Sequence, residues 1–154
     1  TAGYAYVPRY VFDKAQRDFL HPDESRVWEQ FLMTNSVGRL FFEHRYRLEQ
    51  RWIGADTPNG STRYINRIRY MIRVSIPINT QKIEKGTWFL NFYDELFMNI
   101  VQNPFDRNRL YGAIGYQFAP SANVQLGYMV QTVGAVTKPY FQLALFYNID
   151  LRKK

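Results

Sequence analysis

The sequence contains no cysteine, only two histidines and no long apolar run. Without cysteine, disulfide bridges, thiolate metal sites and cysteine nucleophiles are excluded. No stretch approaches the roughly 18 consecutive apolar residues that a membrane-spanning helix needs. The mean hydropathy of -0.40 leaves a membrane protein possible, because the strands of a membrane β-barrel alternate apolar and polar residues.

A formal charge of +7 does not indicate a nucleic-acid partner, because the basic residues are spread along the chain and no basic cluster stands apart from acids. The length of 154 residues suits a single domain over residues 1–154. Aromatic residues make up 18% of the chain, more than a typical soluble domain has. Since the chain starts at Thr1 without a signal peptide, we expect a processed or incomplete N-terminus.

Eight segments are predicted to be strands, because apolar and polar side chains alternate along them with a period of two. Two irregularities remain. His44 and Gln50 fall on the apolar side of one segment, and Asp94 sits among apolar residues of another, so we expect a bulge near Asp94 or a position close to the membrane rim. The predicted segments are residues 3–10, 26–34, 40–52, 67–76, 88–101, 109–118, 124–131 and 140–151.

The connections between these segments alternate in length through the first half of the chain. Residues 10–24 and 54–62 form long connections, whereas 35–38 and 119–123 are tight. Outer-membrane barrels have short periplasmic turns and longer external loops. We therefore predict that the tight turns and the C-terminus are periplasmic.

The apolar face of the segments carries large residues, and the other face carries small residues and long charged ones. A membrane barrel turns its apolar face to lipid and its polar face to the lumen, whereas a soluble, lipocalin-like barrel reverses this. We favour the membrane arrangement because tyrosine and tryptophan fall near strand ends, where aromatic girdles form. The predicted fold is an all-β, antiparallel up-and-down transmembrane β-barrel. The girdle candidates are Trp52, Tyr64, Trp88, Tyr116, Tyr128 and Tyr147.

A charged cluster is predicted to face the lumen. One interpretation is a basic constriction that favours anions. The other is an interior ladder of ion pairs that fills the barrel and fixes strand register, and we favour it because buried charges must be paired. The cluster comprises Arg45, Arg47, Arg51, Arg67, Arg69, Arg73, Glu43, Glu49 and Glu95.

The sequence offers little for catalysis, and no enzyme activity, metal or cofactor is predicted. Ser25 lies near His21, but in an expected external loop that holds a catalytic triad poorly. The acids Asp23 and Glu24 could serve a protease, yet acids before a strand are usually solvated. Residues 56–60 resemble part of a calcium loop but lack its later glutamate.

The last predicted strand has the pattern that the outer-membrane assembly machinery recognises. Large apolar residues alternate along it, although the chain continues with Arg152 beyond the last of them. The signal residues are Phe141, Leu143, Leu145, Tyr147, Ile149 and Leu151.

Several blocks resemble an uncharacterised family of bacterial outer-membrane barrels, the domain of unknown function two-four-nine-zero. The blocks are residues 26–31, 43–52, 89–97, 105–116 and 145–151. The resemblance implies further strands before Gly3, so that this chain is the C-terminal part of a barrel of roughly ten to twelve strands, or a shortened relative. It implies no activity and no catalytic residues.

The predicted function is that of an integral outer-membrane protein, a structural or accessory subunit of an envelope complex with a charged, largely filled lumen. A narrow channel for small, for instance anionic, solutes and an envelope hydrolase are the alternatives. Expected partners are outer-membrane lipid and lipopolysaccharide, the assembly machinery and other envelope proteins.

Overall fold

The computed structural model describes residues 1–13, 18–20, 22–55, 57, 60–101 and 103–148. Its regular elements are all β-strands. In this part of the chain, no helix has the length and apolar character to cross a membrane. The all-β prediction is therefore confirmed for the described residues.

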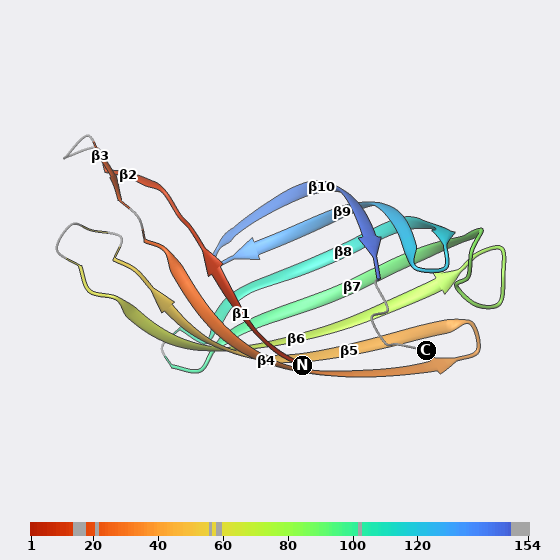
Figure 1. Ribbon diagram of the computed structural model, residues 1–154, viewed down its shortest axis with the longest axis horizontal. Coiled ribbons are helices and arrows are strands. Elements are labelled where there is room, and N and C mark those ends of the chain that lie inside the picture. The colour runs from red at the N-terminus through yellow and green to blue at the C-terminus, as the bar shows by residue number, and fades with distance from the viewer. Residues whose placement is uncertain (14–17, 21, 56, 58–59, 102, 149–154) are drawn as a thin grey trace. The chain divides into compact units, whose positions relative to one another are not determined.

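The main sheet has eight strands, each antiparallel to its neighbours in an up-and-down order (Figure 1). Period-two sequence patterns produce these strands because successive side chains in a strand point to opposite faces. The prediction of eight antiparallel strands is confirmed. In sheet order the strands are β1 (Ala2–Val7), β4 (Glu24–Val37), β5 (Leu40–Ile53), β6 (Arg63–Pro77), β7 (Thr87–Asn99), β8 (Phe105–Ala119), β9 (Ala122–Val133) and β10 (Val136–Tyr147).

A second, two-stranded sheet lies within the predicted long connection between the first two main strands. It pairs β2 (Val11–Asp13) with β3 (Asp18–Leu20). We predicted a loop here, and that prediction is wrong at these residues. Three-residue strands are too short to show the alternation on which the prediction relied.

Tight turns join several neighbouring strands. Gly38 and Gly134 have φ of 59° and 56°, a left-handed conformation that glycine adopts without strain. After the turn at Gly134, β10 begins at Val136, four residues before the predicted start at Tyr140. Pro139 falls in the connection predicted between residues 131 and 140, but it pairs with Val130 inside β10, so that prediction is wrong here. Proline is tolerated there because β10 is the last strand in the sheet order.

Burial alternates with a period of two along β7 and β8, as the sequence pattern predicted for these strands. On β8, Tyr111 and Ala113 are 4% and 8% exposed, whereas Leu110 and Ile114 are 58% and 43% exposed. The alternation on β7 continues without a slip through Asp94. The expected bulge is therefore absent there, and Asp94 lies on the exposed face, where Asn108 donates a hydrogen bond to it.

Aromatic rings pack directly on glycine backbones in adjacent strands. At three glycines the ring occupies the space that a Cβ atom would need. This packing explains the small residues that interrupt the polar face, because glycine within a strand lets a neighbouring side chain approach closely. The pairs are Gly3 with Trp28, Gly115 with Phe89, and Gly127 with Tyr111.

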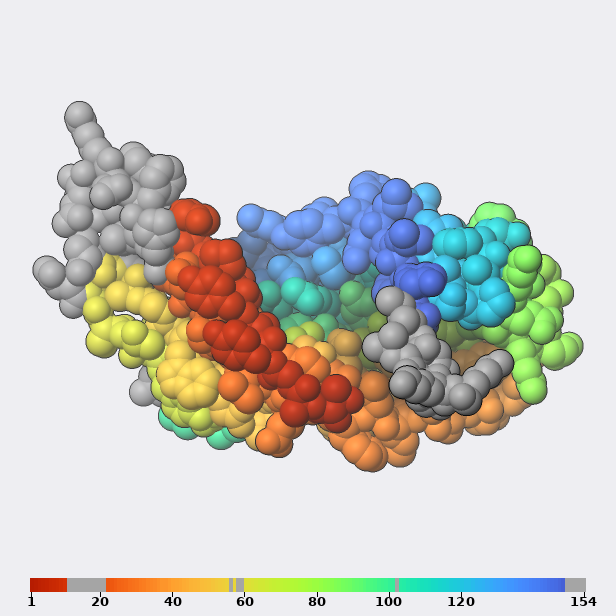
Figure 2. All heavy atoms as spheres, viewed as in Figure 1, coloured from red at the N-terminus to blue at the C-terminus, as the bar shows by residue number. Residues whose placement is uncertain are grey.

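The chain divides into two compact units, and the strands contribute to both. Unit 1 comprises Thr1–Phe31, Arg45–Tyr70 and Phe97–Asp106. Unit 2 comprises Leu32–His44, Met71–Leu96 and Arg107–Lys154. In unit 1, β1 is drawn in red in Figure 2. Tyr4 and Tyr6 of this strand are exposed.

Candidate functional site

Unit 1 contains a cluster of buried, mutually paired charges. Alternate residues of β4, β5 and β6 point to the same face of the sheet, so charges spaced by two residues gather there. We call this group the charge cluster. It comprises Arg9, Glu24, Arg26, Arg47, Glu49, Arg51, Arg67, Arg69 and Asp106.

Glu24 anchors one end of the charge cluster and is completely buried. Arg51 Nε and Nη2 donate to its two carboxylate oxygens at 2.7 and 2.9 Å. Arg26 lies 2.8 Å and Arg9 3.0 Å from the same carboxylate. The expectation that Glu24 is a solvated loop acid is wrong, because Glu24 is the first residue of β4 and faces these arginines.

Glu49 forms the second centre of the charge cluster and is also completely buried. Arg67 donates two hydrogen bonds to one of its oxygens, and Arg69 donates to the other at 2.7 Å. The guanidinium groups of Arg26 and Arg47 lie 3.9 and 3.8 Å away. Four arginines from three strands therefore share one carboxylate, which satisfies the requirement that buried charges be paired.

The charge cluster also reaches across β7. Arg67 Nη1 pairs with Asp106 of β8 at 2.7 Å. Phe97 of β7 lies beneath two guanidinium groups, those of Arg69 at 4.3 Å and Arg67 at 5.2 Å from the ring centroid. The face of an aromatic ring attracts cations, so Phe97 adds to the stabilisation of arginines that outnumber the nearby acids.

Arg47, on the same face, contacts both an amide side chain and an aromatic ring. Its Nε donates to Gln30 Oε1 at 3.0 Å, and its guanidinium group lies 4.3 Å above the ring of Trp28. Trp28 in turn packs on Gly3 of β1. The contacts of Arg47 and Trp28 therefore link three neighbouring strands, β1, β4 and β5.

The structure divides the predicted charged residues between the two units. Arg45, Arg47, Glu49, Arg51, Arg67 and Arg69 belong to unit 1, and Glu43, Arg73 and Glu95 belong to unit 2. In unit 2, Arg73 pairs with Glu43 at 3.2 Å. Glu95 lies 3.7 Å from Arg109, which also donates to Gln131 at 2.8 Å.

Sequence reasoning missed several members of these ion pairs. Arg26 already lies in the predicted segment 26–34 and follows the same period-two pattern as the predicted arginines, and a start two residues earlier would have included Glu24 as well. Asp106 gives no such signal, because its partner Arg67 lies two strands away in the sheet.

Residues considered for catalysis are placed differently from the expectation. Ser25 lies within β4 instead of a loop, and its Oγ is 3.1 Å from the hydroxyl of Tyr4. His21 and Asp56 lie outside the described residues. Over the described ranges, no group of three or more histidine, aspartate or glutamate side chains is arranged to hold a metal ion.

The residues of the predicted assembly signal on β10 are exposed where the structure describes them. Phe141, Leu143 and Leu145 are 86%, 76% and 72% exposed, and Tyr147 follows on the same face at 67%. Residues 149–151, which include the last two predicted signal positions, lie outside the described residues.

Comparison with known proteins identifies the family. Residues 1–142 match the model of the family described as Protein of unknown function (DUF2490), and the chain belongs to that family. No curated protein and no solved structure matches it.

Proposed function

We propose that this family member is an integral β-barrel protein of the bacterial outer membrane, acting as a structural or accessory subunit of an envelope complex, with a charged and largely filled interior. The observation that carries the proposal is the assignment of the two sheet faces. The buried residues include charged and amide side chains together with a few large apolar ones such as Met71, Phe89 and Phe97, whereas most of the large apolar side chains are exposed.

Lipid is the solvent in which this arrangement is favourable. In water, exposed apolar surface costs about 25 cal/mol per Å², and soluble monomers rarely expose large contiguous apolar patches. Here such residues follow one another along the exposed face of neighbouring strands, for example Leu110 and Ile114 on β8 and Leu126 and Tyr128 on β9. A hydrocarbon solvent removes this cost. The described sheet ends at β1 and β10, and the proposal requires that the full-length protein pairs these two edges, because unpaired backbone groups are unfavourable in lipid.

The lengths of the strands and the positions of the aromatic residues also support contact with lipid. The strands from β4 to β10 contain 12 to 15 residues, enough for a tilted membrane span. The ring centroids of Trp52 and Tyr64 lie 5.2 Å apart in a tilted arrangement beside the loop that joins β5 to β6. Those of Trp88 and Tyr116 lie 4.8 Å apart, also tilted, near the ends of β7 and β8. Aromatic residues at these positions suit the membrane–water interface.

The paired interior supports a structural role over transport. The carboxylates of Glu24 and Glu49 are completely buried and engaged by arginines from neighbouring strands. Within unit 1, such pairs favour one register of the strands and occupy space on the polar face that a solute would need. The polar side chains of the charge cluster are therefore engaged in holding the sheet, and we assign them no catalytic role.

A narrow channel for small anions is the second candidate, favoured by one observation. The charge cluster holds six arginines and three acids, an excess of guanidinium groups. Rings of arginine occur in pores that pass anions.

The proposal includes the partners expected of such a barrel. Its exposed face would contact outer-membrane lipid and lipopolysaccharide, and β10 would be recognised by the assembly machinery with the C-terminus in the periplasm. Other envelope proteins would bind the loops or the exposed face.

Fractionation of cells that produce the full-length protein tests the proposed location. We expect the protein in the outer-membrane fraction of a density gradient, released only by detergent and resistant to carbonate washing. A protein that stays in the supernatant after ultracentrifugation, monomeric and without detergent, would contradict the proposal and favour a soluble barrel.

A further inference from the structure

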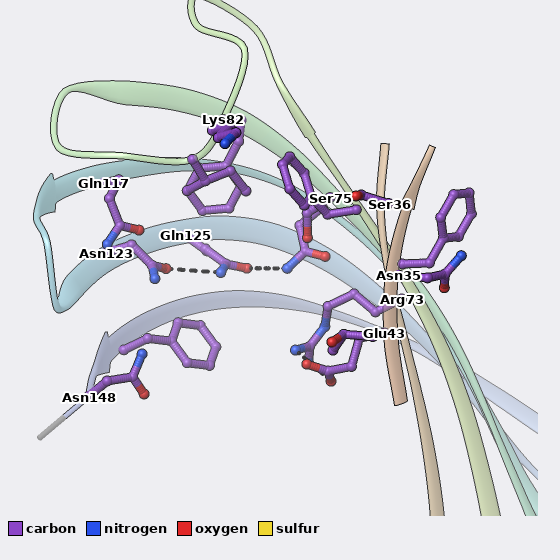
Figure 3. A pocket seen from close by; sticks show the side chains of 17 residues that line it. Asn35, Ser36, Glu43, Arg73, Ser75, Lys82, Gln117, Asn123, Gln125 and Asn148 are labelled. Atoms are coloured by element: carbon purple, nitrogen blue, oxygen red, sulfur yellow. Dashed lines mark hydrogen bonds and ion pairs between the residues drawn. The ribbon is translucent and has the colours of Figure 1, made fainter. Parts of the chain in front are cut away.

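Unit 2 contains a cavity of about 740 Å³ on the polar face of the sheet (Figure 3). This size lies within the range of small-molecule binding sites. Its lining is unlike the charge cluster of unit 1, because amides and phenylalanines dominate it. The amide residues are Asn35, Asn91, Gln117, Asn123, Gln125 and Asn148.

Three of the amides form a hydrogen-bonded row along one wall of the cavity. Asn91 Nδ2 donates to Gln125 Oε1 at 2.9 Å, and Gln125 Nε2 donates to Asn123 Oδ1 at 3.0 Å. Figure 3 shows Gln125 and Asn123 side by side, with Gln117 next to them. The row fixes the orientation of each amide, so that its remaining donors and acceptors are held in place.

Two buried polar atoms among the lining residues have no hydrogen-bond partner. Asn91 Oδ1 is an acceptor, and the residue is only 4% exposed. Arg73 Nε is a donor. Burying such groups without a partner is unfavourable. These two atoms lie beneath the accessible surface, so hydrogen bonds to a ligand come from the other amide groups of the lining. A hydroxyl group both donates and accepts, so a ligand that carries several hydroxyls suits those amides.

The charges of the cavity favour a neutral ligand. Arg73 and Glu43 neutralise each other across 3.2 Å, and Figure 3 shows them together, away from the amide row. The third charged lining residue, Lys82, is exposed. No excess of buried charge like that of the charge cluster therefore faces the cavity.

Aromatic rings complete the lining. Phe41, Phe42, Phe89 and Phe146 all border the cavity, and Phe89 is held in place by its packing on Gly115. Rings provide flat apolar surfaces, and fixed amides provide hydrogen bonds, which is the combination that pockets use to bind and orient small molecules. Sugar rings carry hydroxyls around their edge and apolar C–H groups on their faces, and they fit both parts of this lining.

We propose that the cavity of unit 2 binds a neutral saccharide of about disaccharide size, held by the Asn91–Gln125–Asn123 row and by the phenylalanine rings. This inference does not depend on the membrane location proposed above, since it rests only on the lining of unit 2.

Binding is tested with the full-length protein folded in a detergent without a sugar headgroup. The probes are maltose, lactose and sucrose, with glucose 1-phosphate as a charged comparison, and the readouts are saturation-transfer NMR and titration calorimetry. We expect saturable binding of at least one neutral disaccharide, at least tenfold tighter than binding of glucose 1-phosphate. Absence of saturable binding for all three neutral probes, or tighter binding of the phosphate, would overturn the proposal.

Matched variants locate the binding. Gln125→Leu removes the centre of the amide row, and Ser75→Phe fills the cavity from β6. We expect each variant to weaken disaccharide binding at least tenfold. Gln131→Leu changes an amide on the same face of β9 outside this cavity, and it should bind like the wild type. Equal binding by all three folded variants would place the ligand elsewhere and overturn the assignment.

Discussion

The Arg51 guanidinium group and the Glu24 carboxylate form a two-bond ion pair, with Nε–Oε1 and Nη2–Oε2 distances of 2.7 and 2.9 Å. The two side chains are 5% and 0% exposed and lie on adjacent strands. A bidentate pair of this kind requires both distance and orientation. A slip of one residue between β4 and β5 would turn one partner to the opposite face, so the pair favours a single register.

Removing one partner of this pair should destabilise the protein strongly. Arg51→Leu leaves the buried carboxylate of Glu24 without its main partner, a change that typically costs about 3–5 kcal/mol. Denaturant unfolding of the refolded protein measures the loss. Arg73→Leu is the matched control, because Arg73 and Glu43 are only partly buried and should contribute about 1 kcal/mol or less. Equal losses for both variants would contradict the account.

Glu49 should be replaceable in part by a free anion. Glu49→Gln removes the charge that Arg67 and Arg69 share, so the arginines repel one another and stability falls. Phosphate binds guanidinium pairs and stabilises the folded state by mass action. We expect the denaturation midpoint of Glu49→Gln to rise with phosphate more than that of the wild type, at constant ionic strength. If phosphate raises the denaturation midpoints of Glu49→Gln and of the wild type equally, the arginines do not depend on Glu49 for neutralisation.

The glycines beneath aromatic rings should not tolerate a branched side chain. Valine at Gly115 or Gly127 would overlap the rings of Phe89 or Tyr111, and overpacking of this kind costs about 1–3 kcal/mol. Gly112→Val is the control, because the ring of Phe92 lies 3.3 Å from the position of the added Cβ and has exposed space into which to move. Unfolding midpoints that fall equally for all three variants would contradict the packing described.

The faces of the sheet could be predicted from the sequence, whereas the partners across it could not. Period two is a local property, so Leu110 and Tyr111 were assigned to opposite faces correctly. The pairing of Arg67 with Asp106 depends on which strands lie near one another and on side-chain reach, which no local pattern contains. The same holds for Asn91 and Gln125, whose hydrogen bond spans from β7 to β9.

Strand ends were predicted less well than strand faces, for identifiable reasons. Proline usually ends a strand, so Pro139 was placed in a loop, although a strand at the end of the sheet order accepts it. Glu24 was read as a solvated acid because charge at a strand boundary is usually exposed. Its burial depends on Arg51, 27 residues later in the chain.

A filled interior predicts that the full-length protein does not conduct. In planar lipid bilayers we expect no steady single-channel currents, because the paired charges of Glu24 and Glu49 occupy the interior face. Preparations of a general porin in the same lipid serve as the positive control. Steady unitary currents that favour anions would contradict the filled interior and support the channel alternative.

The assignment of the exposed face to lipid is tested most directly by its tryptophans. The protein has three tryptophans. Trp52 and Trp88 lie on the exposed face at 41% and 48% exposure. Trp28 lies on the polar face, between Gly3 and Arg47. Three variants, each retaining one tryptophan and carrying phenylalanine at the other two positions, place a single fluorophore on a known face.

The measurement is fluorescence quenching of these variants in vesicles whose lipid acyl chains carry bromine. We predict that Trp52 and Trp88 lose about half of their emission or more, as residues at the lipid boundary do, while Trp28 is nearly unaffected. Strong quenching of Trp28 with little effect on the other two, or no quenching of any of them, would contradict the proposal that the apolar face meets lipid.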